Sequence, residues 1–199
     1  FSAVTSFNAT APGNQPGSII ALKMSATQIV IVYRDTSNSG RGTWILGTLT
    51  GSGSGITATW NTKAVFQNNT TANNQYALAA DVLDSTRFIV AYDNNNASLA
   101  AVIGTIAGTG AGATITAGAT LDNIDTSLTK SGRDCAILVM GTDEVLLFYR
   151  RTVDNITRGR VMRLTTTNAD TAAASQTITT GTAIYYTDSA GILSPMAAR

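Results

Sequence analysis

Short apolar runs alternate with polar, glycine-rich loops along the whole chain. Three of these runs share one pattern, in which a polar residue and four consecutive apolar residues lead to a tyrosine, at 28–33, 87–92 and 144–149. The separation between the first and second tyrosines nearly equals that between the second and third. Because a fixed period is typical of repeat architectures, the pattern predicts three successive copies of one structural unit.

The match extends on both sides of each tyrosine. Met24, Leu83 and Met140 each lie nine residues before their tyrosine. A second apolar run follows the polar loop after the tyrosine, and a Gly/Ser/Thr turn then leads to a last run that begins Ile-Thr. In the first two copies the second run carries Gly-Thr, at 47–48 and 104–105. Each copy therefore contains four strand signals separated by turn signals.

These signals predict an all-β chain. The runs span four to eight residues, are rich in Ile, Val, Thr and aromatic residues, and are bounded by Gly, Asn, Asp and Ser. The tyrosine-ended run is apolar on both faces, so we expect it to be buried between neighbouring layers. Four antiparallel strands with one doubly buried strand are typical of a β-propeller blade. The alternative is a β-sandwich or jelly roll, which needs no internal period of this length.

The period also predicts the boundaries of the units. Residues 17–74, 75–133 and 134–191 form three predicted blades, 1–16 match the last strand of a preceding blade and a linker, and 192–199 match the first strand of a further blade. Propeller blades bury their faces against neighbouring blades in a closed ring. We therefore expect a segment of a longer chain with roughly six to eight blades, or, as the less favoured alternative, a ring closed by several copies.

Composition excludes several chemistries. The chain has no histidine and one cysteine, so it has no imidazole base, no histidine-ligated zinc and no disulfide framework. Lys+Arg is 13 against Asp+Glu 12, without a basic block, which predicts no nucleic-acid partner. No apolar run approaches the roughly 18 residues that a membrane span needs. We predict no catalytic residues, no metal and no cofactor.

Polar side chains concentrate in two sets of loops, after the second and the fourth strand of each copy. In a propeller both sets lie on the same face, so this face is the predicted binding surface. Amide, carboxylate, guanidinium and aromatic groups are those that recognise sugars. The predicted ligand-binding residues are Tyr33, Arg34, Asp35, Asn38, Tyr92, Asp93, Asn94, Asn95, Tyr149, Arg150 and Arg151. The alternative is that these side chains cap turns and neighbouring backbone.

An enzyme of this composition would have to use carboxylates. Asp35, Asp93 and Asp154 follow the three tyrosines, and a glycosidase could use such a pair as acid and base. Their quasi-equivalent positions in the repeat suit a scaffold better than an asymmetric catalytic pair. A secreted carbohydrate-active enzyme is thus the alternative to a non-enzymatic protein.

The repeat resembles the propeller repeats of bacteriophage tail and fibre proteins and related virion proteins. The resemblance covers residues 17–187 and lies in strands that end Val-Tyr-Arg-Asp or Val-Ala-Tyr-Asp, an Asn/Ser loop, a strand with Gly-Thr, a glycine turn and Ile-Thr. The third copy lacks Gly-Thr and carries Arg160 and Arg163. The resemblance implies a virion or extracellular surface protein that serves structural assembly or attachment to a host glycan or receptor. Its expected partners are the rest of a longer chain or other copies, other virion subunits and a cell-surface glycan.

Overall fold

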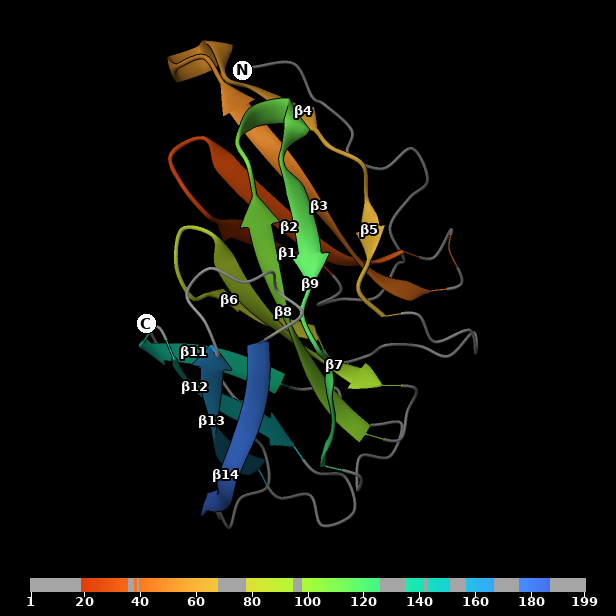
Figure 1. Ribbon diagram of the computed structural model, residues 1–199, viewed down its shortest axis with the longest axis vertical. Helices are drawn as coiled ribbons and strands as arrows, with labels where there is room; N and C mark the ends of the chain where they lie inside the picture. The colour runs from red at the N-terminus through yellow and green to blue at the C-terminus, as the bar shows by residue number, and fades with distance from the viewer. Residues whose placement is uncertain are drawn as a thin grey trace.

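The computed structural model describes residues 19–35, 38, 40–67, 78–94, 98–125, 135–141, 143–150, 157–166 and 176–186. These residues form three antiparallel β-sheets and two short 3₁₀ turns, which confirms the prediction of an all-β chain. The sheets follow one another in chain order along the long axis of the molecule (Figure 1). Within the described ranges, no helix has the length and apolar character needed to cross a membrane.

The first sheet has the strand order β1-β2-β3-β4, and the short β5 also pairs with β3. Each of the first three strands pairs with the next one in the chain, as expected for short runs separated by turn residues. The turn between β3 and β4 contains the 3₁₀ turn η2 (Gly53–Gly55). The strands are β1 (Ile19–Lys23), β2 (Gln28–Asp35), β3 (Arg41–Thr50), β4 (Thr57–Trp60) and β5 (Ala64–Val65).

The second sheet repeats this plan with the order β6-β7-β8-β10, and β9 also pairs with β8. Its 3₁₀ turn η3 (Gly110–Gly112) lies between β8 and β9, where the first sheet has η2. The strands are β6 (Leu78–Val82), β7 (Arg87–Asn94), β8 (Ser98–Ala107), β9 (Thr114–Ala117) and β10 (Leu121–Asp125).

The third sheet has four strands in the order β11-β12-β13-β14, all antiparallel. The fourth strand is continuous here, whereas it is divided into two pieces in the first two sheets. The strands are β11 (Cys135–Gly141), β12 (Glu144–Arg150), β13 (Thr157–Thr166) and β14 (Gln176–Tyr186).

A bulge of identical form divides the fourth strand of the first and second sheets. In the first sheet, Trp60 pairs with Gly47 and Ala64 pairs with Trp44, so residues 61–63 stand opposite only two residues of β3. In the second sheet, residues 118–120 likewise stand opposite two residues of β8. One extra residue on one strand of a pair is a β-bulge, which bends and twists that strand. The sequence indicated one strand at this place in each copy.

The sheets pack face to face through two hydrophobic cores. On β7, Phe88, Val90 and Tyr92 belong to the core shared with the first sheet, and Ile89 and Ala91 belong to the core shared with the third. The expectation that the tyrosine-ended run is buried on both faces is confirmed for this strand. Aromatic rings are concentrated in the first of these cores, where the Trp44 ring centroid lies 4.9 Å from that of Phe66 and 5.3 Å from that of Phe88.

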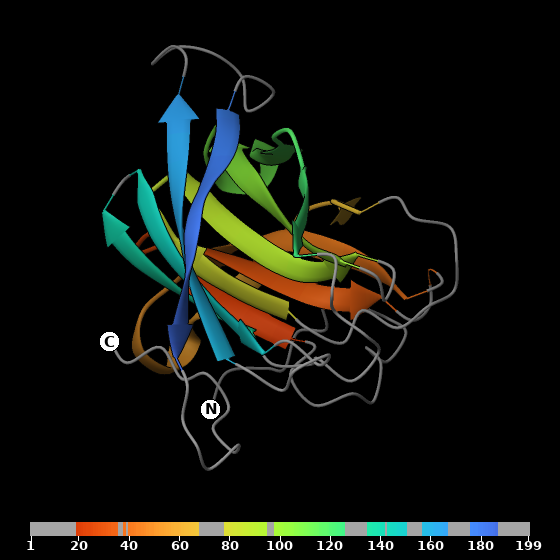
Figure 2. The ribbon, with the colours of Figure 1, turned by 90° about the horizontal axis from the view of Figure 1, so that it is seen from below.

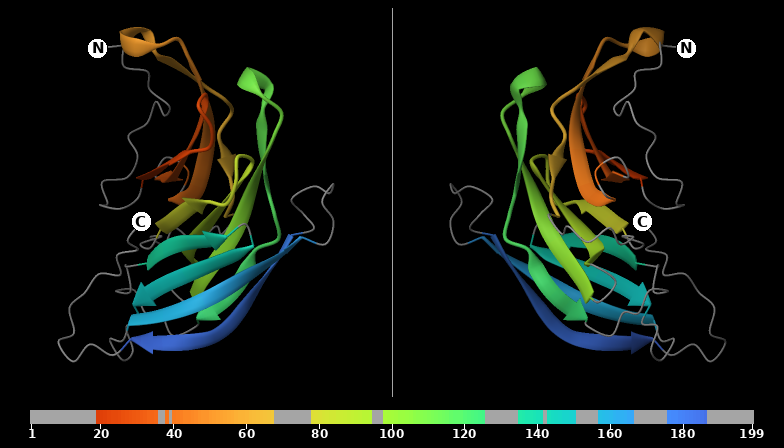
Figure 3. Two further views of the ribbon diagram at one scale, coloured as in Figure 1. Left: turned by 90° about the vertical axis from the view of Figure 1, so that its left-hand side faces the viewer. Right: turned by 90° about the vertical axis from the view of Figure 1, so that its right-hand side faces the viewer.

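The first strands of the three sheets lie together. β6 contacts both β1 and β11, and residues of all three strands line a common cavity of about 540 Å³. Asp81 of β6 reaches across to the third sheet, where its Oδ2 accepts a hydrogen bond from the Val139 backbone N–H at 3.3 Å. Figures 2 and 3 show the sheets stacked in succession with these strands adjacent.

Candidate functional site

The three predicted tyrosines lie near the ends of β2, β7 and β12, and their rings are buried. Tyr33 is 0% exposed, and Tyr92 and Tyr149 are each 1% exposed. The Tyr149 hydroxyl also accepts a hydrogen bond from Arg160 Nε at 3.1 Å. These rings are therefore core residues, and a ligand at this end of the sheets would meet the polar side chains around them.

Burial makes two of these phenols difficult to ionise. Burial, with a smaller effect from the Asp35 carboxylate, raises the pKa of Tyr33 to about 12. Burial likewise raises the pKa of Tyr92 to about 12; a hydrogen bond with Thr120 opposes the shift, and the charge of Asp122 adds to it. Both groups are neutral donors at physiological pH and are not poised for acid-base chemistry there.

Asp35 ends β2 and is fully buried, in spite of its charge. Lys63, in the bulge of the fourth strand, donates a hydrogen bond from Nζ to Asp35 Oδ2 at 2.6 Å. The lysine side chain is 42% exposed, so its stem covers the carboxylate while part of the side chain reaches water. A carboxylate held in this way stabilises the end of the sheet rather than being presented to a ligand.

A second polar chain links the first sheet to the second at the same end. Gln67 Nε2 donates to Asn94 Oδ1 at 2.9 Å, and Asn94 Nδ2 donates to Asp122 Oδ1 at 2.7 Å. Asn94 ends β7 as Asp35 ends β2, and each bonds to a residue 28 positions later. The partners of Asp35 and Asn94 are not equivalent: Lys63 is the last residue of the bulge, where the second sheet has Thr120, and Asp122 lies on β10, where the first sheet has Val65.

The other residues of the predicted binding set differ in burial and in position. Asp93 is buried at 3% exposure, Asn38 is half-buried, and the Arg34 guanidinium lies beside Gly40. Arg150 ends β12, and Asn95 and Arg151 lie outside the described residues. The structure pairs Asp35 and Asn94, which end equivalent strands, with other polar side chains at one end of their sheets. Ligand binding by the predicted set stays a prediction.

Lys63 was missed as a functional partner because a lone lysine between two strands carries no motif. Lys63 reaches Asp35 from the bulge, whereas the sequence indicated one unbroken strand at this place. The sequence therefore held no signal for this pair.

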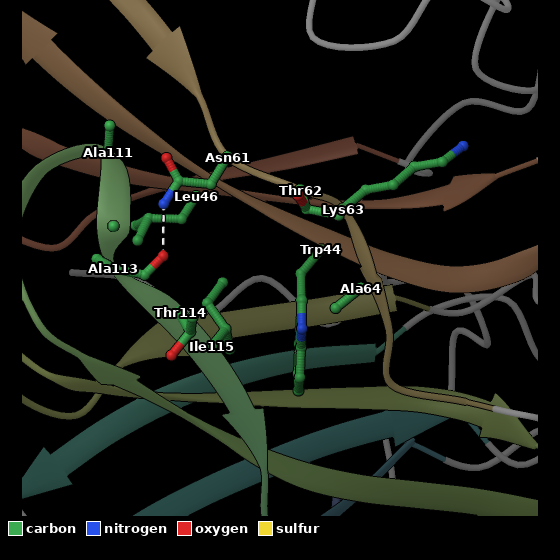
Figure 4. Close-up of a pocket in the computed structure, with 11 residues that line it drawn as sticks. Trp44, Leu46, Asn61, Thr62, Lys63, Ala64, Ala111, Ala113, Thr114 and Ile115 are labelled. Atoms are coloured by element: carbon green, nitrogen blue, oxygen red, sulfur yellow. Dashed lines mark hydrogen bonds between the residues drawn. The ribbon is translucent and has the colours of Figure 1, made fainter.

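A cavity of about 300 Å³ lies between the outer strands of the first and second sheets (Figure 4). One wall comes from β3, the bulge and the start of β5; the other comes from η3 and β9. The two walls are joined by a hydrogen bond from Asn61 Nδ2 to the Ala113 carbonyl oxygen. The lining residues are Trp44, Leu46, Asn61, Thr62, Lys63, Ala64, Ala111, Gly112, Ala113, Thr114 and Ile115.

Two buried polar atoms in the lining of this cavity have no hydrogen-bond partner among the described residues. Trp44 is 1% exposed, and its indole N–H is unpaired. Asn61 uses its amide nitrogen on Ala113, whereas its Oδ1 accepts no hydrogen bond from the described part of the chain. Because each atom has almost no accessible surface, neither is presented to the open space of the cavity.

No lining residue directs a charged group into the cavity. Lys63 extends away from Asn61 and Ala113 toward the end of the sheet, where it pairs with Asp35 (Figure 4). The other lining residues are apolar, small or polar and uncharged. Elsewhere in the described part of the chain, no group of three or more His, Cys, Asp or Glu side chains is placed to hold a metal ion. The cavity therefore suits a neutral ligand with both polar and apolar groups.

Comparisons of the chain with protein-family models, curated proteins and solved structures find no match.

Proposed function

We propose that this chain is a non-enzymatic β-propeller segment of a virion or secreted surface protein, which serves structural assembly or attachment to a host glycan or receptor. The observation that carries the proposal is the position of β6 between β1 and β11. In a propeller the first strands of successive blades gather around the central axis, and each blade packs against its two neighbours. Three sheets of one repeat that meet through their first strands are consistent with three such blades.

The state of the carboxylates supports a non-enzymatic role. Asp35 is held by Lys63 at the end of the first sheet, and Asp93 is 3% exposed. A glycosidase needs one carboxyl as acid and a second as base or nucleophile, both facing the sugar. Carboxylates that are buried in the sheets instead support a scaffold that works by shape and by loop hydrogen bonds.

The outer face of the third sheet is where a further blade could pack. Leu146 and Phe148 of β12 point to the side opposite the core residues Val145 and Leu147, and they are partly exposed. The equivalent residues of β7, Ile89 and Ala91, pack against the next sheet. A further blade, from a longer chain or another copy, would bury Leu146 and Phe148 in the same way.

The attachment role is tested by glycan-array binding of the full chain, followed by incubation of each bound glycan with the protein. We expect retention of one glycan class with no release of sugar. If the chain releases sugar, and this release is lost in D35N or D93N, the non-enzymatic proposal is overturned in favour of a carbohydrate-active enzyme. Absence of glycan binding would leave assembly as the role, which is tested by co-sedimentation with other virion subunits.

A further inference from the structure

We propose that the outer face of the third sheet binds the same face of a second copy of this chain, in a two-fold dimer. This inference rests on the proposed role in assembly and names its partner. Met140 on this face is 63% exposed, whereas Met24 and Leu83, at the equivalent repeat position, are 5% and 6% exposed. Met24 lies in the core between the first and second sheets, and Leu83 in the core between the second and third. Met140 thus lies on a face that no further sheet covers within the described ranges.

The rest of this face matches surfaces that are buried elsewhere in the molecule. Leu146 and Phe148 of β12 stand where β2 has Val30 and Val32. Both valines are 0% exposed and belong to the core between the first two sheets, whereas Leu146 and Phe148 are partly exposed. Val161 of β13, the cross-strand partner of Leu146, is also partly exposed. The outer face of the third sheet therefore continues the kind of interface that already joins the sheets.

The opposite end of the stack does not offer a matching surface. Ile31, Tyr33 and Ile45 alternate with the core residues of their strands, so they lie on the outer face of the first sheet. They are already buried, at 7%, 0% and 3% exposure. A second copy therefore meets the third sheet through its own third sheet. Contact of two copies through the same patch gives a closed two-fold dimer, the commonest symmetry of soluble oligomers.

The charges at one end of this face suit a two-fold contact. Glu144 and Arg163 are cross-strand partners whose side chains are 48% and 72% exposed, and Arg163 Nη2 lies 3.1 Å from Glu144 Oε1. A two-fold axis that runs along the strands, between β12 and β13, places Glu144 of each copy opposite Arg163 of the other. Unlike charges then meet across the interface, which favours this alignment of the two faces.

The size of the face predicts a reversible dimer. The strands of the third sheet have 7 to 11 residues. From the rise per residue and the spacing between strands, a four-stranded face of this length covers roughly 500 Å². Two such faces together bury roughly 1,000 Å², near the lower limit of specific interfaces, so we expect association at micromolar concentrations.

The test is sedimentation velocity of the full chain across a range of micromolar concentrations, which should show a monomer–dimer equilibrium. L146D and M140D each place a carboxylate on the proposed interface, and each should raise the dissociation constant of the dimer at least about tenfold. I56D is the matched control. Ile56 is 42% exposed but lies between β3 and β4 of the first sheet, so this substitution should leave the dissociation constant unchanged.

A charge exchange tests the two-fold arrangement. E144K makes this end of the face positive and R163E makes it negative, so each variant alone should dimerise more weakly than the wild type. An equal mixture of the two variants should form a heterodimer at least about fivefold tighter than either homodimer, because opposite charges then face each other. A mixture that associates no more tightly than the separate variants would overturn the two-fold arrangement.

Far-ultraviolet circular dichroism and the melting temperature verify that each variant is folded, and exposed Met140 provides the test if L146D does not fold. A wild-type chain that remains monomeric at its highest soluble concentration would overturn the inference, and a further sheet of a longer chain would then be the cover of this face. A dimer that persists unchanged in folded M140D would also overturn it. Neither result alters the glycan-array test, which decides the proposed attachment function by its own readout.

Discussion

Glycine in the third strand makes room for an aromatic ring on a neighbouring strand. A Cβ atom added at Gly47 would lie 2.5 Å from the Trp60 ring, and one added at Gly104 would overlap the ring of Phe88. Phe88 is the cross-strand partner of Gly104, and its ring also packs on Trp44 in the core between two sheets. The Gly-Thr motif of the repeat thus has a steric cause.

We expect G104A to lower the free energy of unfolding by about 1–3 kcal/mol, because the buried Phe88 ring must move. Urea unfolding followed by fluorescence measures the effect. G112A is the matched control, since a Cβ atom there meets nothing within 4 Å, and its effect should stay within about 0.5 kcal/mol. Equal effects of the two substitutions would contradict the steric explanation.

The buried tyrosines predict a loss of stability at alkaline pH. Tyr33 and Tyr92 have folded-state pKa values of about 12 against an ordinary value of 10.0. The unfolded chain therefore loses these protons first as the pH rises, and the stabilisation present below pH 10 is lost between about pH 10 and 12. Chemical unfolding at pH 9, 10 and 11 should show this decline, and Y33F/Y92F should reduce its slope. An unchanged slope in Y33F/Y92F would show that other groups cause the decline.

At the scale of elements, the second strand of each of the first two sheets ends in a polar side chain that pairs with the fourth-strand region. Asp35 pairs with Lys63 in the bulge of the first sheet, and Asn94 pairs with Asp122 on β10 in the second. The two partners lie at different positions of the repeat, so each pair is specific to its sheet.

We expect K63D alone to destabilise the chain by about 2 kcal/mol or more, because it places a second carboxylate beside buried Asp35. In the double variant D35N/K63D, the amide introduced at position 35 can donate to the carboxylate introduced at position 63, so at least half of that loss should be recovered. A double-mutant cycle from urea unfolding measures the coupling between the two positions. Additive effects of D35N and K63D would show that the two positions are not coupled.

The strands were predictable from sequence because hydrophobic pattern and turn residues repeat together. The division of the fourth strand was not, since a bulge at residues 61–63 depends on how many residues stand opposite on β3. Burial of the apolar run before each tyrosine was predicted, whereas Tyr33 itself was placed among the ligand-binding residues and is a core residue. Trp44 lies on β3 and Asn61 in the bulge after β4, and only the packing of two sheets places both on one cavity.

At the scale of the whole molecule, the three sheets pack in chain order. A sandwich of two layers would bury one face of each sheet. Here the second sheet is covered on both faces, by the first and by the third. This arrangement extends by addition of further sheets of the same kind, which is how a repeat scaffold grows.

Nuclear Overhauser contacts in the isotopically labelled chain test this arrangement most directly. We predict contacts from residues of β6, such as Val82, to both β1 and β11, together with contacts between the rings of Trp44 and Phe88. Contacts from β6 to only one of the two strands, or to neither, would contradict the central claim that successive sheets meet through their first strands.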